Sequence, residues 1–180
     1  FGLQGQKCSA CSRVYVDRKI KARFLDQLLA KTMALTIGDP ANRDIYLGPL
    51  INHESVRRFR RVVAEAQGDG GAILHGGEIL NHDDHRHGFF VTPTIVDGLP
   101  RSHRLFRDEL FLPLLAVTTV DSLEQAVQYA NNVDYGLTAG IYARNKKELR
   151  YFFDHIEAGV TYANRRSGAL RNRACPRVIA

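Results

Sequence analysis

The stretch Ser12–Pro40, SRVYVDRKIKARFLDQLLAKTMALTIGDP, decides the fold because two different periodicities follow one another within it. In its first residues, SRVYV, polar and apolar side chains alternate, which predicts a short strand. Apolar residues then recur at steps of three and four, which predicts a long amphipathic helix that Gly38-Asp39-Pro40 ends. A strand that leads directly into a helix is the repeating unit of α/β proteins.

Helical periodicity returns in three later segments. A second helix is predicted around Val56–Ala66, with the glycines of GDGG at its end. Ser122 and Gln125 have the spacing of a capping box and predict a helix that runs up to Asn131-Asn132. A last helix is predicted over Lys147–Ala158, closed by Gly159 in a left-handed cap.

Between these helices lie short apolar segments that predict strands. They are AILHGG, GFFVTPTIV, LPLLAVTTV, YGLTAGIYA and VTYAN. In the second of them, Pro93 indicates a bend or an edge position. Because the strands alternate with helices, we predict an α/β fold: one mostly parallel sheet with helices on both faces.

The composition is that of an ordinary globular chain. It has 180 residues, of which 44% are hydrophobic and 24% charged, enough for one well-buried domain. No apolar run reaches the ~18 residues of a membrane span, so no membrane partner is expected. The start of the chain does not read as a signal peptide, and three cysteines, an odd number, favour a reducing compartment: the cytoplasm, or the mitochondrial matrix in a eukaryote.

A net charge of +6 would suit a nucleic-acid partner, but the distribution of the charge argues against one. Four arginines lie on one predicted helix whose opposite face is apolar: Arg57, Arg58, Arg60 and Arg61. No nucleic-acid-binding motif accompanies them. We therefore predict a solvated basic face and no nucleic-acid partner.

The segment GQKCSAC, Gly5–Cys11, carries two of the three cysteines. A zinc site lacks the second pair of ligands, since Cys175 stands alone. A thioredoxin-like redox pair should begin a helix, whereas a strand follows here. A third interpretation makes Cys8 a single nucleophile. Gly5 would let the backbone approach closely, the charge of Lys7 would favour the thiolate, and backbone N–H groups would receive an oxyanion. The residues alone also leave open a buried, inert cysteine.

The stretch HDDHRH, His82–His87, offers metal-ligating side chains at consecutive positions. Consecutive residues cannot all converge on one ion, so a hydrated loop is the simpler interpretation. We predict no metal site.

Four segments, in this order, carry a resemblance to a known family: GQKCSACSRVYV, DELFLPLLAV, NNVDYGLTAGIYAR and TYANRRSGA. Together they resemble the catalytic half of the aldehyde dehydrogenase superfamily, through about residue 170. GQKCSA combined with NRRSGA is most similar to the 1-pyrroline-5-carboxylate dehydrogenase branch. The resemblance implies an oxidoreductase of proline catabolism that converts L-glutamate γ-semialdehyde, a small-molecule aldehyde, to L-glutamate.

The resemblance also implies roles for individual residues. Cys8 would attack the aldehyde carbon to form a thiohemiacetal, which becomes a thioester when hydride leaves to NAD. Glu109 would bind the ribose hydroxyls of the nicotinamide nucleotide, and Phe111 would pack near the nicotinamide ring. Leu112 stands where the family usually has glycine, which would narrow the cofactor cleft.

Four further residues match substrate-binding positions of this family. Ser9, Gly168 and Ala169 would hold the amino acid end of the semialdehyde, because small residues with free N–H groups suit a carboxylate. Asn164 matches an asparagine near the site, and its side chain could equally tie a strand to a loop.

The same resemblance predicts a division of the chain. Residues 1–170 would form the catalytic domain and residues 171–180 an irregular tail, while the cofactor domain, the deprotonating glutamate and an oxyanion asparagine would lie upstream. We therefore expect the isolated chain to be inactive and the intact parent to be a homo-oligomer. The residues that separate NAD from NADP would also lie upstream, so NADP stays open. The alternative is a non-catalytic remnant or oligomerisation fragment of the same fold.

Overall fold

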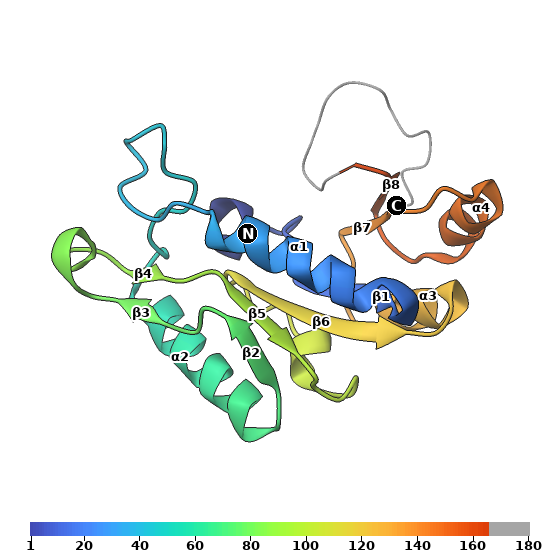
Figure 1. Cartoon of the computed structure of the whole chain (residues 1–180), viewed down its shortest axis with the longest axis horizontal. Helices are drawn as coiled ribbons and strands as arrows, with labels where there is room; N and C mark the ends of the chain where they lie inside the picture. Colours follow the sequence, from blue (N-terminus) through green and yellow to red (C-terminus); the bar gives the residue numbers. More distant parts are fainter. Residues whose placement is uncertain (166–180) are drawn as a thin grey trace.

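The computed structural model describes residues 1–165, which form an α/β fold around a four-stranded sheet (Figure 1). The strand order is β1 (Arg13–Asp17), β6 (Leu114–Val120), β5 (Thr94–Asp97), β2 (Ala72–His75). β1 and β5 both run parallel to the central β6, while β2 is antiparallel to β5. The predicted mostly parallel sheet is confirmed.

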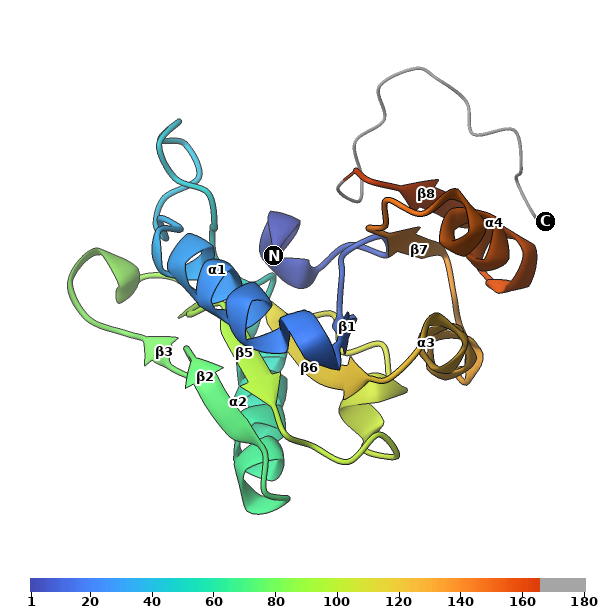
Figure 2. The same ribbon diagram turned by 45° about the vertical axis from the view of Figure 1, so that its right-hand side comes forward.

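Two long helices cover opposite faces of this sheet (Figure 2). α1 (Lys21–Met33) packs on one face in a cluster that includes Leu115 and Val117, and α2 (His53–Gly68) packs on the other in a cluster that includes Leu114 and Ala116. Successive residues of β6 thus enter different clusters. A strand that is buried on both faces needs a continuous apolar run, which is why LLAV carries no polar residue.

The helix α1 ends at Met33, earlier than the glycine that was expected to stop it. The residues that follow are held by a loop instead. The hydroxyl of Thr36 accepts a hydrogen bond from the Tyr46 N–H, and the carbonyl of Thr36 accepts one from the Leu47 N–H. Ile37 then forms a bridge with Leu47. These tertiary contacts compete with the continuation of the helix, and helix propensity alone could not anticipate them.

A small antiparallel pair, β3 (Ile79–Leu80) and β4 (Phe90–Val91), lies beside the main sheet. Pro93 falls between β4 and β5, in the break that separates the two strands. Short 3-10 helices cover Gly2–Gly5, Arg18–Ile20, Asp83–His85 and Arg104–Phe106. No helix among residues 1–165 has the combination of length and apolar character needed to cross a bilayer.

The last part of the described chain forms its own layer, built from α3 (Leu123–Asn131), β7 (Thr138–Ile141), α4 (Lys146–His155) and β8 (Val160–Ala163) (Figure 2). β7 and β8 pair in parallel as a separate two-stranded sheet and do not extend the sheet of β1. The expectation of one sheet was wrong in this respect. This layer has a hydrophobic cluster of its own, formed by Val127, Phe152, Ile156 and Ala158.

α4 ends at His155, and the predicted left-handed cap at Gly159 is wrong, because this glycine is not in the left-handed region. Ile156 instead turns to extended backbone, with ψ 132°, and enters the core. Asn131 holds this turn: its Nδ2 donates to the His155 carbonyl at 2.8 Å, and its Oδ1 accepts from the Glu157 N–H at 2.9 Å.

Candidate active site

Two segments that are distant in sequence meet at one edge of the main sheet. The segment Gly5–Ser12 precedes β1, and the segment Glu109–Pro113 precedes β6. Because β1 and β6 are adjacent and parallel, their preceding segments lie on the same side. The topology therefore brings the nucleophile candidate toward the cofactor-binding candidates.

Cys8 lies in a tight turn. The N–H of Ala10 donates to the carbonyl of Lys7 at 2.9 Å, which places Cys8 and Ser9 at the two central positions. The Cys8 thiol is free and the residue is exposed. Within the described part of the chain nothing accepts a hydrogen bond from the Cys8 N–H. An exposed thiol beside an unengaged N–H is suited to attack on a carbonyl group.

Gly5 brings this turn against the backbone of the second segment. It has φ +67°, and a Cβ at this position would lie 2.0 Å from the Leu112 carbonyl oxygen. Leu3 and Gln4 also have positive φ, at 53° and 55°, so the chain makes a left-handed turn just before the cysteine. The predicted close backbone approach at Gly5 agrees with this geometry.

Gln6 fastens the cysteine turn on its other side, a role that the sequence analysis missed. Its Oε1 accepts from the N–H of Ile51 at 3.0 Å, and its Nε2 donates to Ser55 Oγ at 3.5 Å. Ser55 is itself held by Asn52, whose Oδ1 caps α2. No sequence pattern announces a contact between residues so far apart.

A small cavity of about 30 Å³ lies where these segments meet. Its walls include Cys8, Cys11, Glu109, Phe111 and Tyr135. The structure thus brings the predicted nucleophile and both predicted cofactor residues to one place. The cavity has room for about one water molecule, so it forms at most one end of a larger binding site.

Glu109 and Phe111 differ in how they are held. Glu109 is exposed, and its carboxylate makes no hydrogen bond or ion pair to any residue from 1 to 165. Phe111 has φ 56°, which is strained for a side chain of this size. The side chain of Leu112 is 4% exposed and belongs to the core cluster under α2, although the residue also borders the cavity.

Tyr135, a second residue that the sequence analysis did not single out, connects the site to β1. Its hydroxyl donates to the carbonyl of Asp108 at 2.9 Å. The guanidinium of Arg13 lies 5.2 Å from the centre of the Tyr135 ring, and its Nη1 donates to the carbonyl of Phe106 at 2.7 Å. We call Arg13 and Tyr135 the brace. The only earlier signal was that Tyr135 lies within the segment NNVDYGL.

Cys11 borders the same cavity and is also a free thiol. Its Sγ donates to the carbonyl of Arg13 at 3.4 Å. Although the residue as a whole is exposed, the surrounding protein desolvates the thiolate and so raises the pKa of the Cys11 thiol above its ordinary value.

The predicted substrate-binding residues lie away from this cavity or outside the described residues. Ser9 is half-buried in the cysteine turn and is not on the cavity wall. The Asn164 amide is fully engaged by Ala143, from whose N–H it accepts at 3.1 Å and to whose carbonyl it donates at 2.9 Å. Gly168, Ala169 and the segment 171–180 lie outside the described residues.

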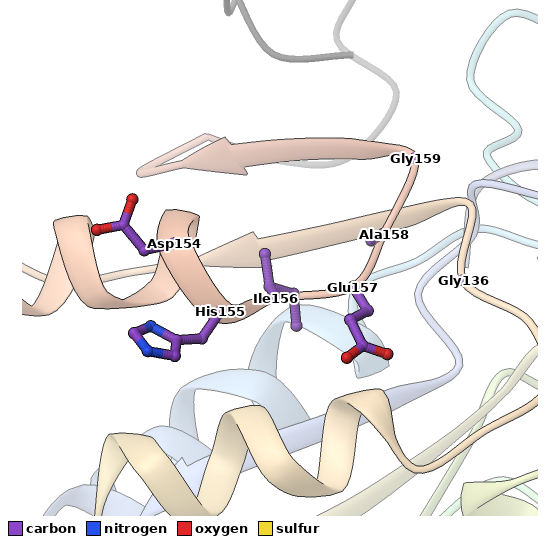
Figure 3. A pocket seen from close by; sticks show the side chains of 7 residues that line it. All are labelled: Gly136, Asp154, His155, Ile156, Glu157, Ala158 and Gly159. Atoms are coloured by element: carbon purple, nitrogen blue, oxygen red, sulfur yellow. The ribbon is translucent and has the colours of Figure 1, made fainter. Parts of the chain in front are cut away.

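A second cavity, an open groove of about 670 Å³, lies elsewhere, at the end of α4 (Figure 3). Asp154–Gly159 and Gly136 line it. In Figure 3 the side chain of Asp154 points away from those of His155 and Glu157, so these groups do not converge. His155 is occupied by Tyr151, on whose ring it stacks at 4.1 Å and to whose carbonyl its Nδ1 bonds at 2.8 Å. None of the predicted site residues within 1–165 lines this groove.

One cluster of metal-ligating types occurs among residues 1–165: Glu65, Asp69 and His103. His103 Nδ1 accepts from the Leu105 N–H at 3.2 Å, so Nε2 carries the proton that it shares with Asp69 at 3.0 Å. Glu65 accepts from Arg104 at 2.7 Å. These groups satisfy one another and leave no lone pair on the imidazole for an ion.

The stretch His82–His87 forms a loop whose side chains are used locally. His82 Nδ1 lies 3.0 Å from Asp83, Arg86 donates to His87 at 2.9 Å, and His85 reaches the carbonyl of Ile37 at 3.2 Å. The side chains point to separate partners, as expected for consecutive residues.

Comparison with known proteins gives a consistent family. The sequence model described as "Aldehyde dehydrogenase family" matches residues 1–175. Alpha-ketoglutaric semialdehyde dehydrogenase of Bacillus subtilis (strain 168) is 34% identical over 97% of this chain and 36% of its own length. 1-Pyrroline-5-carboxylate dehydrogenase of Staphylococcus haemolyticus is also 34% identical, over 92% of this chain and 31% of its own length.

Solved structures agree. Lactaldehyde dehydrogenase from Escherichia coli has a TM-score of 0.85 and 33% identity, covering 91% of this chain and 34% of its own. Betaine aldehyde dehydrogenase from Staphylococcus aureus, solved in complex with NAD+, has a TM-score of 0.86 and 27% identity, covering 89% and 32%. The chain thus spans about a third of the length of the proteins that it matches.

Proposed function

The chain belongs to the aldehyde dehydrogenase family, and from this premise we propose that residues 1–170 are the thiol-bearing part of the active site of a dehydrogenase that oxidises L-glutamate γ-semialdehyde to L-glutamate. The observation that carries the proposal is the small cavity, which is lined both by Cys8, with its exposed free thiol, and by Glu109, whose carboxylate has no partner among residues 1–165. Residues 171–180 would be an appended tail.

In the proposed reaction Cys8 does the covalent chemistry. Its sulfur attacks the aldehyde carbon, the carbonyl bond opens, and the oxygen takes up the negative charge of a thiohemiacetal. The unengaged N–H of Cys8 would donate to this oxygen. A thioester on the same sulfur then releases the acid when water attacks it.

The cofactor that we propose is NAD, with NADP as the other possibility. The residues present fit one end of such a molecule: Glu109 offers a carboxylate without a partner among residues 1–165, and a carboxylate pairs well with two ribose hydroxyls. Phe111 would lie near the ring. When bound, the cofactor supplies the hydride acceptor. The described residues contain no glycine-rich phosphate turn, so we place the rest of its binding site in a separate, upstream domain.

The proposed substrate rests on the cysteine segment and on the relatives. One relative is named for 1-pyrroline-5-carboxylate and another for a semialdehyde that also ends in a carboxylate. Ser9, Gly168, Ala169 and Asn164 would bind the amino acid end of the substrate. We place the reaction in proline catabolism, in the cytoplasm or the mitochondrial matrix, in a parent protein that forms homo-oligomers.

Selective alkylation tests the proposal on the chain as it stands. Both residues are exposed, but the Cys11 thiol donates to the Arg13 carbonyl and desolvation raises its pKa, so we expect iodoacetamide to label Cys8 several-fold faster than Cys11. Equal, slow labelling of both would overturn the nucleophile assignment. That result would support the alternative, a non-catalytic remnant or oligomerisation fragment.

The activity assay has two arms. The isolated chain should give little or no NADH from glutamate semialdehyde, because a nucleophile without its base and cofactor domain loses orientation and activation. A longer polypeptide that joins this chain to a cofactor domain should give NADH and should lose that activity on Cys8→Ser. A Cys8→Ser variant with full activity would refute the proposal.

A further inference from the structure

Cys11 has no part in the proposed reaction, yet it borders the same cavity as Cys8. Both thiols are free. The cavity measures about 30 Å³, so the two residues face a space that holds about one water molecule. No other described residue is a cysteine, since the third, Cys175, lies beyond residue 165.

The chain between these cysteines is weakly fastened, whereas its two flanks are firm. On one side Gln6 is held by its side-chain bond to Ile51, and on the other side Arg13 begins β1. Between them the turn from Lys7 to Ala10 has a single backbone hydrogen bond. Such a segment can adjust its backbone while its ends stay in place.

We propose that Cys8 and Cys11 form a site of reversible oxidative modification, in which a peroxide joins them in an intramolecular disulfide. A disulfide needs Cα atoms about 4.4–6.8 Å apart. Two cysteines three residues apart reach this separation when a turn spans them. The existing turn joins Lys7 to Ala10, with Cys8 inside it and Cys11 one residue past its end, so closure requires this weakly fastened segment to shift its turn by one residue. Closure would break the contact from Cys11 Sγ to the Arg13 carbonyl.

The chemistry balances with the peroxide as sole oxidant. The Cys8 thiolate attacks one peroxide oxygen, the O–O bond breaks, and hydroxide leaves to become water. Cys8 is now a sulfenic acid. The Cys11 sulfur attacks the Cys8 sulfur, the S–O bond breaks, and a second water leaves with the proton of Cys11. Two thiols have lost two electrons and two hydrogens, and the peroxide has become two waters.

The modification would have two effects on Cys8. It prevents the Cys8 sulfur from attacking an aldehyde, and it stops the oxidation of this sulfur before the irreversible sulfinic acid forms. Because desolvation raises the pKa of the Cys11 thiol, the closing step should become faster as the pH rises toward that value. Thiol reduction would restore the free nucleophile.

A tryptic digest can detect this disulfide by mass, because trypsin cuts after Lys7 and after Arg13. The peptide Cys8–Arg13 therefore contains both cysteines of the pair, while Cys175 falls in the peptide Ala174–Arg177. The folded chain is treated with hydrogen peroxide, alkylated with iodoacetamide in denaturant and digested. We expect peptide Cys8–Arg13 to lose two hydrogens in mass and to carry no alkyl group, and we expect dithiothreitol to reverse both changes.

Two variants control the test. Cys11→Ser should accumulate sulfinic acid on Cys8 about tenfold more than the parent chain under the same treatment, because the resolving thiol is gone. Cys175→Ser should still form the disulfide. A linkage between the peptides Cys8–Arg13 and Ala174–Arg177, or a Cys8 that is equally over-oxidised with and without Cys11, would overturn the proposal. The mass readout requires neither aldehyde nor cofactor, so it can fail or succeed independently of the proposed dehydrogenase function.

Discussion

At the scale of single residues, Gly5 determines how closely the two halves of the site approach. Its backbone is left-handed, and the position of its missing Cβ is occupied by the Leu112 carbonyl. Any side chain would have to push the cysteine turn away from the segment that carries Glu109. A glycine three residues before the nucleophile is therefore a geometric requirement of the cavity.

We predict that Gly5→Ala lowers the free energy of unfolding by about 2–5 kcal/mol, from backbone strain plus overlap with the Leu112 carbonyl. Gly70→Ala is the matched control, because Gly70 has φ +86° but nothing within 4 Å of its Cβ position. It should cost only about 1–2 kcal/mol of backbone strain. Urea denaturation of both variants measures the difference, and equal losses would contradict the packing argument.

At the scale of elements, the brace connects the start of β1 with the segment before β6. Arg13 and Tyr135 contact each other, and each also bonds a backbone carbonyl just ahead of that segment, at Phe106 and Asp108. Glu109 follows directly, exposed and without a partner of its own among residues 1–165. By holding the backbone at Phe106 and Asp108, the brace restrains the position of Glu109 relative to β1.

Removing one hydroxyl tests the brace. Tyr135→Phe keeps the ring under Arg13 and loses only the bond to the Asp108 carbonyl, so we expect about 0.5–1.5 kcal/mol less stability and roughly 2- to 10-fold faster amide exchange over residues 108–112. Tyr129→Phe is the control, because the Tyr129 hydroxyl makes no hydrogen bond within residues 1–165. Hydrogen exchange measured by mass spectrometry should separate the two variants. Equal exchange in both would exclude a positioning role for the hydroxyl.

At the scale of the whole molecule, the core is divided into three clusters. Two lie on opposite faces of the main sheet, and the third lies within the layer of α3, α4, β7 and β8. Few polar contacts join this layer to the sheet, among them the Tyr15 hydroxyl to the Tyr129 carbonyl at 3.2 Å and the Arg18–Asp121 ion pair at 2.6 Å. Exposed ion pairs contribute little, so the layer should open as a unit of its own.

Phe152→Ala tests this division, because Phe152 is 5% exposed and belongs to the third cluster. We expect a loss of about 3–5 kcal/mol that appears as faster amide exchange in α3, α4, β7 and β8, with β1, β5 and β6 still protected. Phe59→Ala, in the cluster under α2, should instead speed exchange in the main sheet. A uniform rise over both regions in the Phe152 variant would show that the molecule unfolds as one unit.

The local features of this protein follow from local sequence. Alternation in SRVYV predicts β1, the apolar run before Ser122 predicts a strand buried on both faces, and Ser122 does cap α3 by accepting from the Gln125 N–H at 3.2 Å. Each depends on residues within one or two turns of each other. The α/β class belongs to the same category. The residue type at Gly5 predicted a close backbone approach, but its partner, the Leu112 carbonyl, is a tertiary contact.

The tertiary structure alone decided which distant groups meet. It determined the early end of α1, the separate pairing of β7 with β8, the brace, and the meeting of Cys11 and Glu109 around one cavity. Periodicity records which face of an element is apolar, but not which partner covers it, because many pairings bury the same area. The parallel pairing of β1 with β6 makes that choice, and it brings the thiol and the carboxylate to one edge of the sheet.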